Sequence, residues 1–119
     1  MVRTVLVVDD NPSDLDRLSK LVSGAGYLVS TAVNGKLALE SVAKSKPDCV
    51  LMDVNMPEMD GFAATRQLRN NPETKDIPVV LVTAKDQKAD KAWGQMLGAK
   101  GYITKPYVDA EVLDVVRSL

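Results

Sequence analysis

The chain contains no histidine among its 119 residues and only one cysteine, Cys49. Without histidine it has no histidine base, no histidine metal ligand and no phosphohistidine. A single cysteine excludes a disulfide within the chain, and its place inside an apolar run predicts a buried thiol in a reducing compartment. Basic residues are not in excess either, with 15 Lys and Arg against 16 Asp and Glu. This balance argues against a broad nucleic-acid-binding surface.

Long hydrophobic runs are also missing. No stretch approaches the ~20 apolar residues that a membrane-spanning helix needs, and no signal-peptide pattern precedes the first strand. We therefore expect a cytoplasmic protein without a membrane segment. The length and the 45% content of hydrophobic residues suit one domain with a real core. We expect residues 1–119 to form this single domain, without an output domain.

The apolar run at residues 48–53 organises the rest of the chain. It is too short for a helix and is bounded by Pro47 and Pro57, so it predicts a strand buried on both faces. The strand ends on one carboxylate, Asp53, and a loop of turn-forming residues follows. In parallel α/β sheets ligands bind at the carboxyl ends of the strands, so Asp53 is expected to carry chemistry.

Strand and helix signals alternate along the whole chain. Further strands are expected at residues 4–8, 27–32, 77–82 and 102–104. Helices are expected at about 12–24, 35–44, 61–69, 89–97 and 108–119. In the fourth helix an apolar stripe with a period of 3.6 is expected to face the core (Ala89, Ala92, Trp93, Met96 and Leu97). In the last helix the inward face is expected to hold Val108, Val112, Val115 and Leu119. This order predicts an α/β fold, a doubly wound five-stranded parallel sheet with helices on both faces.

Polar side chains stand at or just beyond four strand ends: Asp9 with Asp10, Asp53, Thr83 and Lys105. In a doubly wound sheet these ends meet at one edge. Three clustered carboxylates repel each other unless a cation joins them, and Mg²⁺ suits a site of few carboxylates. Lysine and threonine side chains can hold phosphate oxygens, and an aspartate can itself accept a phosphoryl group. The combination therefore indicates phosphoryl transfer.

Each of these residues also has a simpler interpretation when it is taken alone. Asp9 and Asp10 could form a solvated turn or a helix cap, and Asp53 could be a turn residue. Thr83 is a common strand residue, and Lys105 could be solvated. Tyr102 is most simply a half-buried sheet aromatic, and Trp93 and Met96 are expected in the core. An acid pair, an acid, a hydroxyl and a lysine at four different strand ends are nevertheless unexpected by chance.

Four motifs make the sequence similar to a known family. They are Val-Leu-Val-Val-Asp-Asp at 5–10, Leu-Met-Asp-Val-Asn-Met-Pro-Glu-Met-Asp-Gly at 51–61, Val-Leu-Val-Thr-Ala at 80–84 and Gly-Ala-Lys-Gly-Tyr-Ile-Thr-Lys-Pro at 98–106. Over its whole length the chain resembles the receiver domain of two-component response regulators, of the stand-alone type typified by the chemotaxis protein CheY. The resemblance implies a flavodoxin-like sheet with strand order 2-1-3-4-5.

By this resemblance Asp53 is the phosphoacceptor, and the cofactor is Mg²⁺ or Mn²⁺. The implied metal ligands are Asp10, Asp53 and the main-chain carbonyl of Asn55, and Asp9 would act through a metal-bound water. Lys105 would pair with the phosphoryl oxygens, and its bond to Pro106 would be cis.

The resemblance also implies a switch. Thr83 would hydrogen-bond a phosphoryl oxygen, and Tyr102 would follow it inward as the switch aromatic. Two positions beside the acid are expected to tune the lifetime of the phosphoryl group: Asn55 by leaving a path for water, and Lys85 by contacting the phosphoryl oxygens.

The implied partners are proteins, with no nucleic acid and no membrane. A separate histidine kinase or phosphotransfer protein would supply the phosphoryl group. A downstream protein would bind the face of the fourth helix, fifth strand and fifth helix, where Lys91, Lys100 and Tyr102 are candidates. The protein is expected to be a monomer, with a phosphorylation-dependent dimer left open. The regions 86–94 and 98–99 resemble single-domain regulators of type IV pilus motility, which suggests a role in motility or taxis.

Three other functions stay open. An aspartate-nucleophile phosphatase would need a second acid two residues after the nucleophile, where this chain has Asn55. A flavodoxin-like nucleotide or flavin binder lacks support, because the chain has no P-loop and no complete dinucleotide fingerprint. A receiver-like scaffold that is never phosphorylated is the third.

Overall fold

Five parallel strands form one sheet in the computed structural model, which describes residues 2–119. The elements alternate along the chain: β1 Thr4–Val8, α1 Pro12–Gly24, β2 Leu28–Ala32, α2 Gly35–Lys44, β3 Cys49–Met52, α3 Gly61–Asn70, β4 Val79–Thr83, α4 Lys88–Met96, β5 Gly101–Thr104 and α5 Asp109–Ser118. The spatial order is β2-β1-β3-β4-β5, and every neighbouring pair is parallel. The expected fold class and strand order are therefore confirmed.

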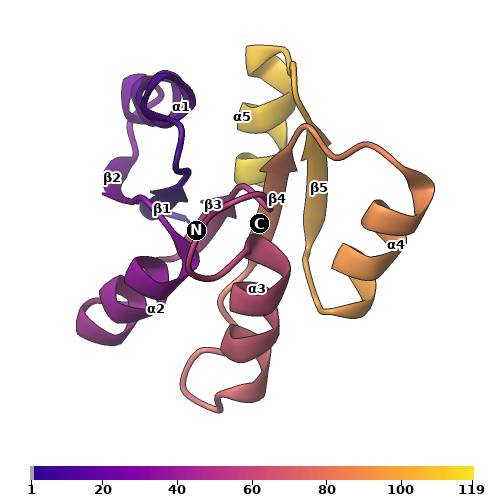
Figure 1. Ribbon diagram of the computed structural model, residues 1–119. Helices are drawn as coiled ribbons and strands as arrows, with labels where there is room; N and C mark the ends of the chain where they lie inside the picture. Colours follow the sequence, from indigo (N-terminus) through magenta and orange to yellow (C-terminus); the bar gives the residue numbers. More distant parts are fainter. Residues whose placement is uncertain (1) are drawn as a thin grey trace.

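Helices cover the sheet on both faces (Figure 1). Alternate residues of the central strands face opposite sides, so Val5 and Val7 of β1 pack in one hydrophobic cluster, and Leu6 and Val8 pack in the other. The first cluster includes residues of α1 and α5, and the second includes residues of α2 and α3. Because β1, β3 and β4 are buried on both faces, their sequences are nearly continuous runs of apolar residues.

The inward stripe expected for α4 is wrong. Trp93 is 46% exposed and Met96 is 76% exposed, and Ala89 and Ala92 also face solvent. The residue of α4 that is buried is Gly94: a Cβ there would lie 3.0 Å from the side chain of Leu81 and 3.3 Å from the ring of Tyr102. The helix packs closely through this glycine, and its apolar stripe is left on the surface.

The other differences from the expected elements are small. Val108 is 69% exposed because it is the N-cap residue of α5, and Val116 is buried instead. Strand β4 starts at Val79 rather than at residue 77, directly after Pro78, which has no N–H to donate to a neighbouring strand. Within residues 2–119, no helix combines the length and apolar character required to cross a bilayer.

Candidate functional site

Three carboxylates meet at the carboxyl edge of the sheet. Asp9 follows β1 directly, and its N–H still bonds to the Ala32 carbonyl of β2 at 3.2 Å. Asp53 follows β3, and its N–H donates to the Val8 carbonyl at 3.0 Å. Carboxylate oxygens of Asp9, Asp10 and Asp53 lie within 4.8 Å of one another. Asp9 is 2% and Asp53 9% exposed, whereas Asp10 faces solvent.

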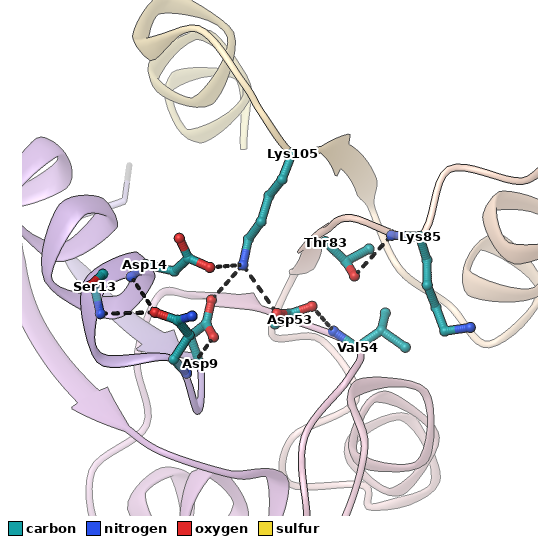
Figure 2. Close-up of polar contacts among 9 residues, drawn as sticks. Asp9, Ser13, Asp14, Asp53, Val54, Thr83, Lys85 and Lys105 are labelled. Carbon is teal, nitrogen blue, oxygen red and sulfur yellow. Dashed lines mark hydrogen bonds and ion pairs between the residues drawn. The ribbon is translucent and has the colours of Figure 1, made fainter.

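Lys105 places its ammonium group among these acids. Its Nζ lies 2.7 Å from Asp9 Oδ2, 3.1 Å from Asp53 Oδ2 and 3.1 Å from Asp14 Oδ2 (Figure 2). The side chain reaches the cluster from the segment after β5, and the expected cis bond between Lys105 and Pro106 is confirmed. A single lysine thus contacts three carboxylates, two from the β1–α1 region and one from the end of β3.

Burial and ion pairing shift the protonation equilibria in this cluster. Burial raises the pKa of Asp9 above its ordinary value, although hydrogen bonds from Lys105 and from the Asn11 N–H act in the opposite direction. Burial alone would lower the pKa of Lys105, but its hydrogen bonds to the three carboxylates raise that pKa overall. Lys105 is therefore a permanent cation at neutral pH, and a divalent cation would compete with it for the same oxygens.

The Asp14 contact was missed in the sequence, where Asp14 is simply an acid in the first turn of a helix. That turn is held in place by Asn11, whose side-chain oxygen accepts the N–H groups of Ser13 and Asp14 at 2.9 and 3.1 Å. The helix start therefore points the Asp14 carboxylate at Lys105 (Figure 2). The signal that could have indicated it is the position of Asp14 in the first turn of a helix that starts just after the end of β1, at the ligand edge of the sheet.

Thr83 and Tyr102 lie on neighbouring strands beside the acids. Thr83 is fully buried at the end of β4, and its hydroxyl oxygen accepts the Lys85 N–H at 3.3 Å. The Tyr102 hydroxyl donates to the Lys85 carbonyl at 2.7 Å. Burial raises the pKa of Tyr102 to about 12, so this hydroxyl keeps its proton. Both side chains of the expected switch pair thus contact the backbone of Lys85.

Lys85 and Asn55, the two residues expected to tune the lifetime of the phosphoryl group, lie in the loops after β4 and β3. The Lys85 ammonium lies 3.8 Å from Asp90 in the first turn of α4, and Figure 2 shows its side chain running away from Lys105. Asn55 is exposed in the loop after β3. In that loop the Val54 N–H donates to Asp53 Oδ1 at 2.6 Å, which fixes the orientation of the carboxylate.

The residues present suit a hard divalent cation. Two largely buried carboxylates and one exposed carboxylate converge, and all of their donor atoms are oxygens, which Mg²⁺ and Mn²⁺ prefer. The exposed position of Asp10 leaves one side of the cluster open to water and to a ligand. A cluster of carboxylates beside a lysine and a buried hydroxyl, at the edge of a doubly wound sheet, is the arrangement that the sequence predicted for a protein of phosphoryl transfer.

The comparisons with known proteins identify the family. The model of the response regulator receiver domain matches residues 5–117, and the chain belongs to this family. It is 47% identical to protein PilH of Pseudomonas aeruginosa over 92% of this chain and 89% of PilH. It is also 43% identical to the response regulator PleD of Caulobacter vibrioides, but spans only 26% of that protein.

Solved structures agree with this assignment. The chemotaxis protein CheY4 of Vibrio cholerae has a TM-score of 0.92 at 32% identity, covering 99% of this chain and 98% of CheY4. The receiver domain of the sensor histidine kinase PA1611 of Pseudomonas aeruginosa has a TM-score of 0.90 at 27% identity, covering 99% and 97%. In that structure a magnesium ion is coordinated in the active-site cleft. Receiver domains are signalling switches of two-component systems rather than classical enzymes.

Proposed function

We propose that this chain is a single-domain response regulator whose Asp53 accepts a phosphoryl group from a histidine kinase or phosphotransfer protein. The observation that carries the proposal is the contact of Lys105 with Asp53 inside a cluster of three carboxylates. The transfer forms a P–O bond to an Asp53 oxygen and breaks the P–N bond of the donor phosphohistidine, whose nitrogen keeps the electron pair. Residues 1–119 contain no histidine, so the donor histidine lies outside them.

The side chains around Asp53 suit this reaction. Asp10, Asp53 and the Asn55 carbonyl would hold Mg²⁺ or Mn²⁺, with Asp9 acting through a bound water. The ion supplies positive charge that stabilises the transferring phosphoryl group. Lys105 already faces the Asp53 oxygen at 3.1 Å and would donate to a phosphoryl oxygen. The Thr83 hydroxyl, which accepts only the 3.3 Å contact from Lys85, is free to turn and donate to another.

Incubation with acetyl phosphate and Mg²⁺ is expected to add one phosphoryl group to the protein, detected by intact-mass analysis. A chelator should prevent the gain, because the clustered carboxylates then have no divalent cation. Asp53→Asn should also prevent it, since an amide oxygen is a poor nucleophile. Asp16→Asn removes an exposed acid of α1 that pairs with Lys20 at 3.0 Å, and it serves as the matched control that should be phosphorylated normally.

An unmodified wild-type protein with an intact fold would refute phosphorylation and leave the scaffold function. Turnover of an external phosphate ester would instead favour a phosphatase.

The lifetime of the phosphoryl group is proposed to depend on Asn55 and Lys85. Asn55 is exposed beside the acid, and the long Lys85 side chain could leave Asp90 for a phosphoryl oxygen, since its ion pair is loose at 3.8 Å.

The output surface is proposed to be the face of α4, β5 and α5. Lys91 of α4 and Lys100 line a pocket with Tyr102 on this face, and the exposed Trp93 and Met96 add apolar contact area elsewhere on the surface of α4. Aromatic residues are enriched among binding hot spots, and the lysines suit a partner with acidic residues. Phosphorylation would draw Thr83 toward Asp53, and the Lys85 backbone, bonded to both Thr83 and Tyr102, would carry the change to α4.

Trp93 is the only tryptophan of the chain and should report this change. We expect its fluorescence to shift on phosphorylation and to return at the rate at which the mass gain is lost. In Thr83→Ala the mass gain should persist but the fluorescence shift should disappear, whereas Thr83→Ser should retain both. A shift that survives in Thr83→Ala would show that α4 responds without Thr83.

The cellular role is also a proposal. The likeness to PilH and the resemblance to regulators of type IV pilus motility support a role in motility or taxis. The balanced charge supports protein partners rather than nucleic acid. We propose a cytoplasmic monomer, and dimerisation on phosphorylation can be tested by sedimentation of the phosphorylated protein.

A further inference from the structure

The Lys105 ammonium group uses all of its hydrogen-bonding capacity. An ammonium has three N–H donors and no acceptor. In this structure those donors face three carboxylates: Asp9 at 2.7 Å, Asp53 at 3.1 Å and Asp14 at 3.1 Å. The proposed phosphoryl transfer involves Asp53 and Asp9 but gives no role to Asp14. Asp14 is nevertheless as close to Lys105 as the phosphoacceptor is.

We propose that Asp14 is a positioning residue for phosphoryl transfer: together with Asp9 it holds two N–H groups of Lys105 so that the third faces Asp53. This inference rests on the proposed function. The lysine stem has four carbons and many rotamers, so a single acceptor would leave the ammonium free to turn. Two acceptors on the β1–α1 side leave one direction for the remaining N–H.

The local structure makes Asp14 a suitable holder. Its backbone N–H bonds to the side chain of Asn11, and Pro12 occupies the first helical position, so the first turn of α1 is rigid. Asp9 is fixed in a different way, since it is buried at the end of β1 and also accepts the Asn11 N–H at 2.9 Å. The two holders therefore come from adjoining but separately anchored segments.

The direction of the third N–H matters in the transition state. When acetyl phosphate is the donor, a P–O bond forms to an Asp53 oxygen, the P–O bond to the acetyl group breaks, and acetate leaves with the electron pair. The N–H that contacts Asp53 in the resting protein is the one nearest to the incoming phosphoryl oxygens. Its aim therefore affects the maximal rate of transfer more than the binding of the donor.

A purely electrostatic role for Asp14 predicts the opposite sign. Its side chain is 44% exposed, and its negative charge would repel an anionic donor. If repulsion were its main effect, neutralising Asp14 would lower the donor concentration needed for half-maximal rate and speed the reaction. Positioning predicts a slower maximal rate with little change in that concentration.

The test measures phosphorylation by acetyl phosphate and Mg²⁺ in Asp14→Asn, Asp14→Ala and the control Asp16→Asn. We expect the maximal rate to fall about tenfold in both Asp14 variants, less than the ~100-fold that a 1 Å misplacement can cause, because Asp9 still holds the ammonium. The half-saturating donor concentration should stay within about twofold of wild type. Asp14→Glu keeps a carboxylate and should recover part of the rate, and Asp16→Asn should match wild type.

A second measurement needs neither metal nor phosphoryl donor. In nitrogen-15 NMR of the resting protein, the Lys105 ammonium protons should exchange with water faster in Asp14→Asn than in wild type, and Asp16→Asn should leave them unchanged. An unchanged or higher maximal rate in Asp14→Asn, or unchanged exchange, overturns the inference. If wild type takes up no phosphoryl group, the proposed function and the role of Asp14 in transfer both fail, while the exchange data still decide whether Asp14 holds Lys105.

Discussion

Replacing Gly61 with alanine is expected to lower the free energy of unfolding by about 3 kcal/mol. Helix α3 begins at Gly61, directly against the end of β3. A Cβ at this position would lie 2.2 Å from the carbonyl oxygen of Asp53 and 3.0 Å from Cα of Val54. Both neighbours are backbone, so no change of side-chain rotamer can relieve the overlap. The Gly61 N–H also donates to the Val54 carbonyl at 2.9 Å, and any shift of the helix would strain that bond.

Urea unfolding followed by circular dichroism measures this effect. Gly24→Ala is the matched control, because Gly24 also lies in a helix but a Cβ there would meet nothing within 4 Å. That change should be neutral or stabilising by up to ~1 kcal/mol. Equal stabilities of the two variants would contradict the close approach of α3 to β3. Since the overlap falls on the backbone of Asp53, Gly61→Ala should also slow phosphoryl uptake under conditions where it is still folded.

The fold could be predicted because its signals are local. The central strands are buried on both faces and therefore appear as apolar runs, and β1 covers the expected residues 4–8. Asn11 before Pro12 predicts a helix start, and the structure confirms Asn11 as the N-cap of α1. The orientation of α4 could not be predicted in the same way. Its periodicity identifies an apolar stripe, but the burial of Gly94 against Leu81 and Tyr102 depends on contacts between distant segments.

The site could be predicted in part for the same reason. Residues at strand ends meet at one edge in any doubly wound sheet, so Asp9, Asp53 and Thr83 were expected together. Asp14 was not, because it lies in the first turn of α1 rather than at a strand end, and the long Lys105 side chain reaches it there. The direction of Lys85 is a similar case. Its position beside Thr83 favoured a contact with the acids, whereas Asp90, in the first turn of α4, offers it a nearer anion in the resting protein.

Lys105→Met is expected to lower the free energy of unfolding by about 2 kcal/mol at neutral pH in a metal-free buffer. Methionine keeps an unbranched side chain, one heavy atom shorter than lysine, but removes the only cation that contacts Asp9 and Asp53 among the ion pairs of residues 2–119. Breaking a fully buried ion pair typically costs ~3–5 kcal/mol. The loss should be smaller here, because Asp14 is 44% exposed and remains solvated. Chemical unfolding in the presence of a chelator measures the effect.

Lys100→Met is the matched control for this change. Lys100 is exposed, and within residues 2–119 its side chain takes part in no ion pair, so its loss should leave stability nearly unchanged. A Lys105→Met protein as stable as the Lys100→Met protein would mean that the carboxylates need no cation in the resting state. The ion pairs of Lys105 would then matter for the reaction alone.

Addition of Mg²⁺ should stabilise Lys105→Met more than wild type. In wild type the ion must share the Asp9 and Asp53 carboxylates with the positive charge of Lys105, whereas in the variant no other cation contacts them. A tenfold gain in affinity corresponds to about 1.4 kcal/mol of additional stabilisation at saturating Mg²⁺. The dissociation constant can be obtained from the dependence of unfolding on Mg²⁺ concentration. Equal stabilisation of the two proteins would contradict a shared site, because an ion bound elsewhere would not compete with Lys105 for these carboxylates.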